Sequence, residues 1–134
     1  EKIDADNFNL LIHFNLFGST WIVSPLELDY PYGVMVFEIP KNKHFSLVDS
    51  MIENPISVIK NDTNWNKPYK VISEKATLTQ KLKLTSKENF EISGSLFFML
   101  EPICSAITLN FTIINDDGTL KVKKSDRNYS FAKN

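Results

Sequence analysis

The chain has 134 residues, 43% of them hydrophobic and 23% charged, which indicates one folded domain over 1–134 rather than a disordered or fibrous chain. Its net charge of -1, with no lysine-rich block interleaved with aromatics, argues against nucleic-acid binding. The longest apolar runs, such as 96–100, are far shorter than the ~20 residues that cross a bilayer, so we expect no transmembrane segment.

Strand-like alternation dominates the first half of the chain. Residues 8–16 place apolar side chains at every second position, which predicts a half-buried strand because successive side chains of a strand point to opposite faces. Shorter β-branched or aromatic segments predict three further strands, at 21–23, 34–39 and 56–60. Between the last two, 46–53 carries apolar residues at helix-compatible spacing and predicts a helical turn.

The second half of the chain is more regular. A polar stretch, 61–68, is the longest predicted loop. Alternation then recurs in three long segments: 75–85, 90–100 and 107–113. Gln80 is the one polar residue on the apolar face of the first of these segments. After a turn at 116–118, residues 120–122 predict an edge strand, which neighbouring lysines protect from pairing with other chains.

About seven to eight short strands without strand–helix alternation predict an all-β fold, in which two antiparallel sheets pack face to face as a β-sandwich. A sheet closed on itself is the structural alternative. We expect the core to extend over about 8–123 and residues 125–134 to form a loose tail.

Residues that could carry catalysis are sparse. His13 and His44 lack the spacing that places two metal ligands on one face, and the alternation puts His13 on the outer side of its strand. With four glycines and no serine-centred glycine turn, hydrolase and nucleotide-binding sites are disfavoured. The carboxylates lie in loops and turns, where solvation explains them. We therefore predict no catalytic residue, no metal and no cofactor.

Aromatic residues offer one candidate binding feature. Trp65 and Tyr69 lie in and beside the long polar loop, where they could stack on a sugar or a peptide. The alternative is that the aromatics near the loops complete the core and cap the sheet ends, with Trp21 as the core anchor.

Cys104 is the only cysteine, so neither a disulfide within the chain nor a multi-cysteine metal site can form. It lies between the two most regular predicted strands, at a turn or a strand end, where exposure would make its thiol reactive. The alternative is an inert, small hydrophobic residue, because no Lys, Arg or His stands next to it to lower the thiol pKa.

Residues 90–99, followed by Cys104 and 107–113, resemble the C-terminal strands of the periplasmic N-terminal domain of the thiol:disulfide interchange protein DsbD family. The stretches 21–24 and 75–84 fit the same order along the chain. The resemblance implies an immunoglobulin-like antiparallel β-sandwich that passes electrons from a membrane redox protein to thioredoxin-like partners through a cysteine pair. It also implies a periplasmic or otherwise exported location, which suits a first residue other than Met if a leader has been removed rather than the chain shortened.

The family shields its cysteine pair with an aromatic cap loop, and by order along the chain Tyr69 would be the shielding residue here. The chain departs from the family at the decisive position, because only Cys104 of the pair is present and Glu101 stands near the other position. Dithiol–disulfide exchange needs an attacking and a resolving sulfur, so one thiol alone does not complete the cycle.

Three functional hypotheses follow. The first is a non-catalytic binding or interaction module that docks a protein partner at the Cys104 end. The second is a redox protein that forms a mixed disulfide with a partner through this single thiol. The third is a sugar-binding sandwich that uses Trp65 and Tyr69.

Overall fold

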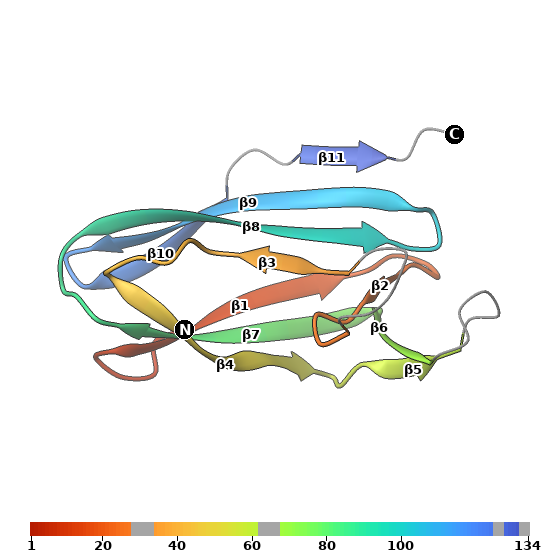
Figure 1. Cartoon of the computed structure of the whole chain (residues 1–134), viewed down its shortest axis with the longest axis horizontal. Coiled ribbons are helices and arrows are strands. Elements are labelled where there is room, and N and C mark those ends of the chain that lie inside the picture. Colours follow the sequence, from red (N-terminus) through yellow and green to blue (C-terminus); the bar gives the residue numbers. More distant parts are fainter. Residues whose placement is uncertain (28–33, 62–67, 125–127, 132–134) are drawn as a thin grey trace.

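The computed structural model describes residues 1–27, 34–61 and 68–124, together with the backbone of 128–131. Within these residues the regular secondary structure is entirely β-strand, and the strands form three antiparallel sheets that pack together (Figure 1). In chain order they are β1 (Asn7–Asn15), β2 (Trp21–Val23), β3 (Val36–Glu38), β4 (Phe45–Asn54), β5 (Val58–Lys60), β6 (Tyr69–Ser73), β7 (Lys75–Leu84), β8 (Phe90–Leu100), β9 (Ser105–Asp116), β10 (Thr119–Lys124) and β11 (Asn128–Phe131). The all-β sandwich predicted from the alternation is confirmed.

Two of the sheets form the long body of the molecule. One has the strand order β1-β7-β4, and the other has the order β10-β9-β8-β3, with β11 also pairing with β9. Figure 1 shows the two sheets as layers one above the other, with their long strands running roughly along the molecule. The β8–β9 pair keeps one register from Phe90 to Leu100, so the strongest alternating segments of the sequence form the longest ladder.

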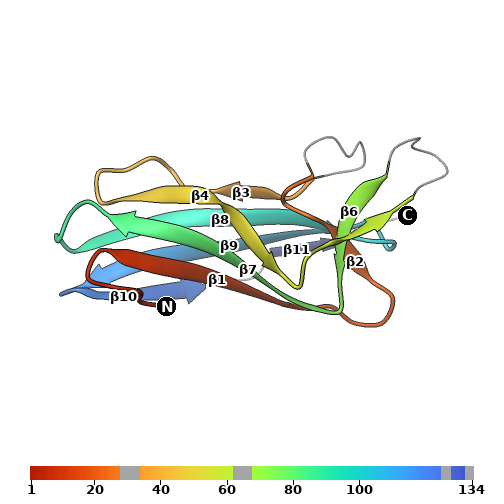
Figure 2. The same cartoon turned by 90° about the horizontal axis from the view of Figure 1, so that it is seen from below.

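The third, small sheet continues the β1-β7-β4 layer beyond a bend. Its strand order, β2-β6-β5, matches the order β1-β7-β4 of the body sheet. The reason is that β1 leads into β2, β4 leads into β5 and β6 leads into β7. Glu74 is the single residue between β6 and β7, and its positive φ of 61° redirects the chain there. Figure 2 shows the small sheet turned away from the long strands at one end of the molecule.

The core lies between the two body sheets. The inward positions predicted for the first strand are confirmed: Phe8, Leu10 and Phe14 are buried, whereas His13 is exposed. The fully buried side chains come from several strands and include Ile22, Leu78, Leu96 and Ile113. Burying each of these residues removes a whole hydrocarbon side chain from water, which stabilises the fold by about 1.5–3 kcal/mol per residue.

The predicted helical turn at 46–53 was wrong, because this segment belongs to β4. Between Val48 and Ile52 the register of β4 on β7 shifts, so that residues 49–51 lie opposite the single residue Gln80. This bulge interrupts the alternation of β4. The apolar residues on either side of it therefore fall at a spacing that imitates a helix.

Gln80, the polar residue on an apolar face, is explained by the same bulge. Its side chain is buried, and its Nε2 atom lies 3.2 Å from the carbonyl oxygens of both Val48 and Asp49. Carbonyl groups that leave a ladder need new donors when they are buried. Gln80 supplies one from the neighbouring strand.

The sequence analysis did not anticipate β4, β6 or β11, so the structure has more strands than the predicted seven or eight. Residues 128–131, which were assigned to a loose tail, pair as β11 with residues 105–108 of β9. On the same edge of β9, β10 pairs with residues 111–116. The remainder of the predicted tail lies outside the described residues.

Candidate functional site

The small sheet and the turn between β8 and β9 meet at one end of the molecule, which we call the small-sheet end. It comprises β2, β5 and β6 with the connecting segments 16–20, 24–27, 55–57 and 101–104. The backbone of Trp21 in β2 exchanges two hydrogen bonds of 2.8 Å with Glu101, directly after β8. This bridge joins the small sheet to the sheet that carries Cys104.

Cys104 lies in this turn, as its position between two regular strands predicted. Its backbone has a positive φ of 53°, and its side chain is exposed. The Glu101 carboxylate raises the pKa of the Cys104 thiol, first by a hydrogen bond that the neutral thiol donates and then by its negative charge. A raised pKa lowers the thiolate fraction near neutral pH, and the thiolate is the nucleophile.

Buried polar atoms accompany the thiol. Glu101 and Ser105 have only 6% and 1% of their surface exposed. Within the described part of the chain, neither Glu101 Oε1 nor Ser105 Oγ has a hydrogen-bond partner. Glu101, which stands near the second cysteine position of the DsbD family, is thus buried beside its backbone bridge to Trp21.

Tyr69, the expected aromatic shield, lies in strand β6 with 2% of its surface exposed. Its ring centroid is 5.8 Å from that of Trp21, and both side chains pack with Val23 and Val71. Lys60 Nζ lies 4.0 Å from the Trp21 ring centroid on the same sheet face, a cation–π contact. Tyr69 is therefore part of a small core rather than a ring presented to solvent, and Trp65 lies outside the described residues.

A cluster of two buried side chains, Ser24 and Glu53, and the half-buried Ser57 lies at the bend. Glu53 at the end of β4 accepts a hydrogen bond from Ser24 Oγ and another, of 2.7 Å, from Ser57 Oγ. Ser24 Oγ also accepts a 3.0 Å bond from the Leu26 backbone N–H. This cluster was not predicted from the sequence. Its one signal is the spacing of Glu53 from Met51, which places both on the inner face of β4 after the bulge.

Large apolar side chains are exposed on the same end. The clearest group is Ile56, Val58 and Ile59, with 80%, 58% and 67% of their surface exposed. The neighbouring segments of this end add Phe17, Leu26 and Ile103. In the described residues β5 pairs only with β6, so its outer edge also carries unpaired backbone groups.

The histidines stand apart from this end. His13 Nδ1 lies 2.9 Å from Thr77 Oγ1 on the exposed face of β1 and β7. His44 stacks on Phe90 with ring centroids 4.9 Å apart. Across the residues whose placement is described, no three His, Cys, Asp or Glu side chains are grouped to hold a metal ion. Nor does any helix there have the length and apolarity to cross a membrane.

The fold is an all-β sandwich whose small-sheet end exposes large apolar side chains and buries several polar ones. No protein-family model, curated protein or solved structure matches the chain.

Proposed function

We propose that the chain is an exported, non-catalytic interaction module that docks a protein partner through the small-sheet end. The observation that carries the proposal is the exposure of Ile56, Val58 and Ile59 on and beside an edge strand. Large apolar side chains that stay exposed contribute little to folding, and on either face of an edge strand they offer apolar contact area to a partner. The exported location is supported by the resemblance to the DsbD domain.

The mode of docking follows from the character of β5. An edge strand offers main-chain donors and acceptors, and the apolar side chains beside it supply the contact area that makes pairing with a partner favourable. The Glu53 cluster and the Trp21–Glu101 bridge hold this edge in place from both sides of the small sheet. The partner surface expected here is an apolar patch next to an extended segment.

The environment of Cys104 supports a role without catalysis. A redox cysteine needs a substantial thiolate fraction, yet Glu101 raises the pKa of this thiol. The chain has no second cysteine to resolve a mixed disulfide. Electron transfer through repeated cycles is therefore not the activity that these residues support.

The direct test is a titration against a purified thioredoxin-like protein and, separately, against the soluble part of a membrane redox protein, by calorimetry. We expect binding to at least one, and loss of that binding in the triple variant Ile56→Ser, Val58→Ser, Ile59→Ser. Val122→Ser is the matched control, because Val122 is also about half exposed but lies on β10, away from this end. Unchanged binding by the triple variant, or no binding by the unaltered chain to either protein, contradicts the proposal.

Redox work through the single thiol is the second candidate, and the exposure of Cys104 favours it. The two candidates differ in the reaction of the native protein with an alkylating thiol reagent. Modification near pH 7 at the rate of a strongly activated thiol supports the redox candidate. Slow modification, together with partner binding that survives Cys104→Ser, supports the interaction module.

The sugar-binding alternative finds less support. A stacking platform needs an exposed ring, whereas Tyr69 is packed under Trp21 in the core of the small sheet. A glycan panel read by intrinsic fluorescence tests what remains of this alternative.

A further inference from the structure

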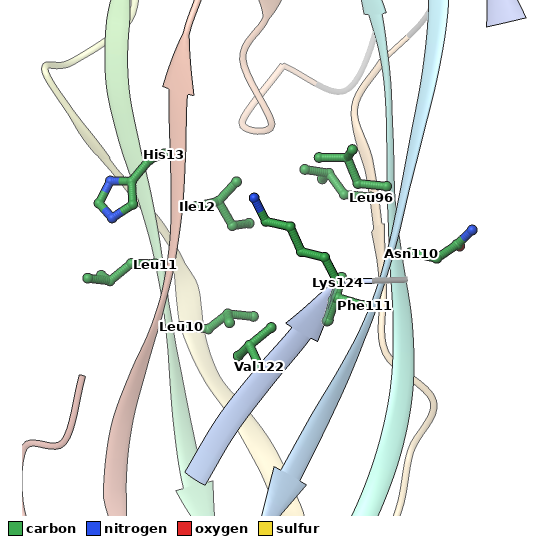
Figure 3. Close-up of a pocket in the computed structure, with 10 residues that line it drawn as sticks. Leu10, Leu11, Ile12, His13, Leu96, Asn110, Phe111, Val122 and Lys124 are labelled. Atoms are coloured by element: carbon green, nitrogen blue, oxygen red, sulfur yellow. The ribbon is translucent and has the colours of Figure 1, made fainter. Parts of the chain in front are cut away.

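A cleft opens along the side of the body, away from the small-sheet end. It lies between β1, the edge of one body sheet, and β9 and β10 at the edge of the other, and its volume is about 180 Å³. Figure 3 shows Leu10 and Ile12 pointing into it from β1, with Leu96 and Val122 facing them from β8 and β10. Its walls are therefore mostly hydrocarbon.

The cleft has few polar residues, and their side chains do not all point into it. His13 and Asn110 belong to its lining, but Figure 3 shows both side chains pointing away from the space, so they contribute backbone. Lys124, at the end of β10, instead extends its side chain into the space between the sheets. The lining contains no Asp or Glu.

Lys124 has no ion-pair partner within the described part of the chain. Among the described residues the ion pair found joins Lys43 to Glu88, and no carboxylate lies within 4.0 Å of the Lys124 ammonium. An apolar cleft with one unpaired cation at its mouth is complementary to a molecule with an apolar body and a single negative charge.

Backbone groups at the rim strengthen this reading. In the β1–β7 ladder the N–H of Asn9 points away from β7, because it bonds to the carbonyl of Glu1. The alternation of an antiparallel ladder gives Leu11 and His13 the same outward direction. Their N–H groups therefore face the rim, where they can donate to an anion.

We propose that this cleft binds a small monocarboxylate, with its apolar part between the sheets and its carboxylate at Lys124. The volume sets the size, since a cavity of about 150 Å³ holds a benzene molecule and an apolar part of roughly six carbons therefore fits. Burial of such a chain in an open cleft corresponds to a dissociation constant on the order of 1 mM. The site is separate from the docking end, so the two proposals stand or fall independently.

The test uses three probes with the same six-carbon body: hexanoate, hexanol and hexylamine. Binding is followed by methyl NMR shifts of the unaltered chain. We expect hexanoate to bind saturably, to shift the methyl groups of Leu10, Ile12 and Leu96, and to bind more tightly than hexanol. Hexylamine binds most weakly, because its charge repels Lys124.

Lys124→Gln is the decisive variant. It should weaken hexanoate binding about threefold to tenfold while hexanol binding stays the same, since only the carboxylate uses the ammonium. Lys123→Gln is the matched control, because Lys123 is the neighbouring residue of β10 and is absent from the cleft lining. Ile12→Phe fills the cleft from β1 and should abolish binding of both probes.

Several results overturn the proposal. One is the absence of saturable hexanoate binding up to about 20 mM, far above the expected dissociation constant. Another is a hexylamine affinity equal to that of hexanoate. A third is an equal loss of hexanoate affinity in the Lys123 and Lys124 variants. A short peptide ending in Leu that binds at least about tenfold more tightly than hexanoate would also overturn it, by assigning the cleft to the end of a protein chain.

Discussion

The body of the sandwich and its small-sheet end differ in how many polar side chains they bury and how many large apolar ones they expose. In the body, Leu78, Leu96 and Ile113 are fully buried between long ladders. The small-sheet end has a small apolar core of its own, but it also buries Thr20, Ser24 and Glu101 and exposes several large apolar side chains. Two further buried polar residues, Glu53 and Ser105, lie in the adjoining body strands β4 and β9. Sequences depart from the rules of folding where another requirement applies, so the exposed apolar and buried polar residues of the small-sheet end point to a functional surface.

The sharpest way to challenge this contrast is to remove a body residue. Leu78→Ala deletes a side chain with no exposed surface from the centre of β7, leaving a cavity that its neighbours fill only in part. We expect the free energy of unfolding to fall by about 2–5 kcal/mol in urea denaturation. A loss below about 1 kcal/mol would mean that the body is not the stabilising region.

Removal of the Glu53 carboxylate tests the polar core of the end. Glu53→Ala leaves the hydroxyls of Ser24 and Ser57 without their acceptor, and we expect a loss of about 1–3 kcal/mol in thermal or urea unfolding. Glu53→Gln keeps the side-chain shape and one of the two acceptor oxygens, so it should lose less stability than the Ala variant and serves as the control. If the Ala variant is as stable as the Gln variant, the cluster does not hold the bend.

Gln80 provides the corresponding polar test within the body. Gln80→Ala removes the donor that serves the bulge carbonyls of Val48 and Asp49, and we expect a loss of about 1–2 kcal/mol. Hydrogen exchange should increase around residues 48–52 more than in the β8–β9 ladder. Uniform exchange across the molecule would contradict a local role for Gln80.

Replacing Glu101 tests the electrostatics of the thiol. Glu101→Gln removes the negative charge that raises the pKa of Cys104, so this pKa should fall toward its ordinary value. The thiolate fraction at pH 8 then rises, and alkylation of Cys104 becomes faster. Glu91→Gln, near the start of β8 and far along the strand from the thiol, is the control and should leave the rate unchanged. Equal rates in all three proteins would remove Glu101 as the cause.

The smallest stability effect is expected at the exposed edge. The double variant Val58→Ser, Ile59→Ser should change the free energy of unfolding by no more than about 0.5 kcal/mol, because both side chains are already in water. It should also lower the binding of an apolar dye. A large loss of stability would show that these residues support the fold instead of presenting a contact surface.

Alternation in the sequence was sufficient to predict the strands that have one buried face. β1, β7, β8 and β9 follow this pattern along most of their length. β6 was missed because Val71 and Ile72 are both buried, one in the small core and the other in the main core, so it shows no alternation. β4 was misread because its bulge breaks the period of two.

The candidate site was predictable only in part. The place of Cys104 on a turn followed from the two regular strands around it. The bridge from Glu101 to Trp21 depends on how distant strands meet, which no local pattern contains. The cleft at Lys124 depends likewise on the spacing between two sheet edges, although the residues that line it lie in correctly predicted strands.

The corner at Glu74 determines how the two regions can move. The chain passes from the small sheet into the centre of the body through this one residue, so it has no slack there. At this connection, rotation of the small sheet would have to change the two backbone dihedrals of Glu74, whose positive φ is already in a sparsely populated region. A load applied at β5 passes through its registered pairs with β6 and then straight into β7. The small-sheet end is therefore stiffly connected to the body, and a partner bound there would fix the orientation of the whole sandwich.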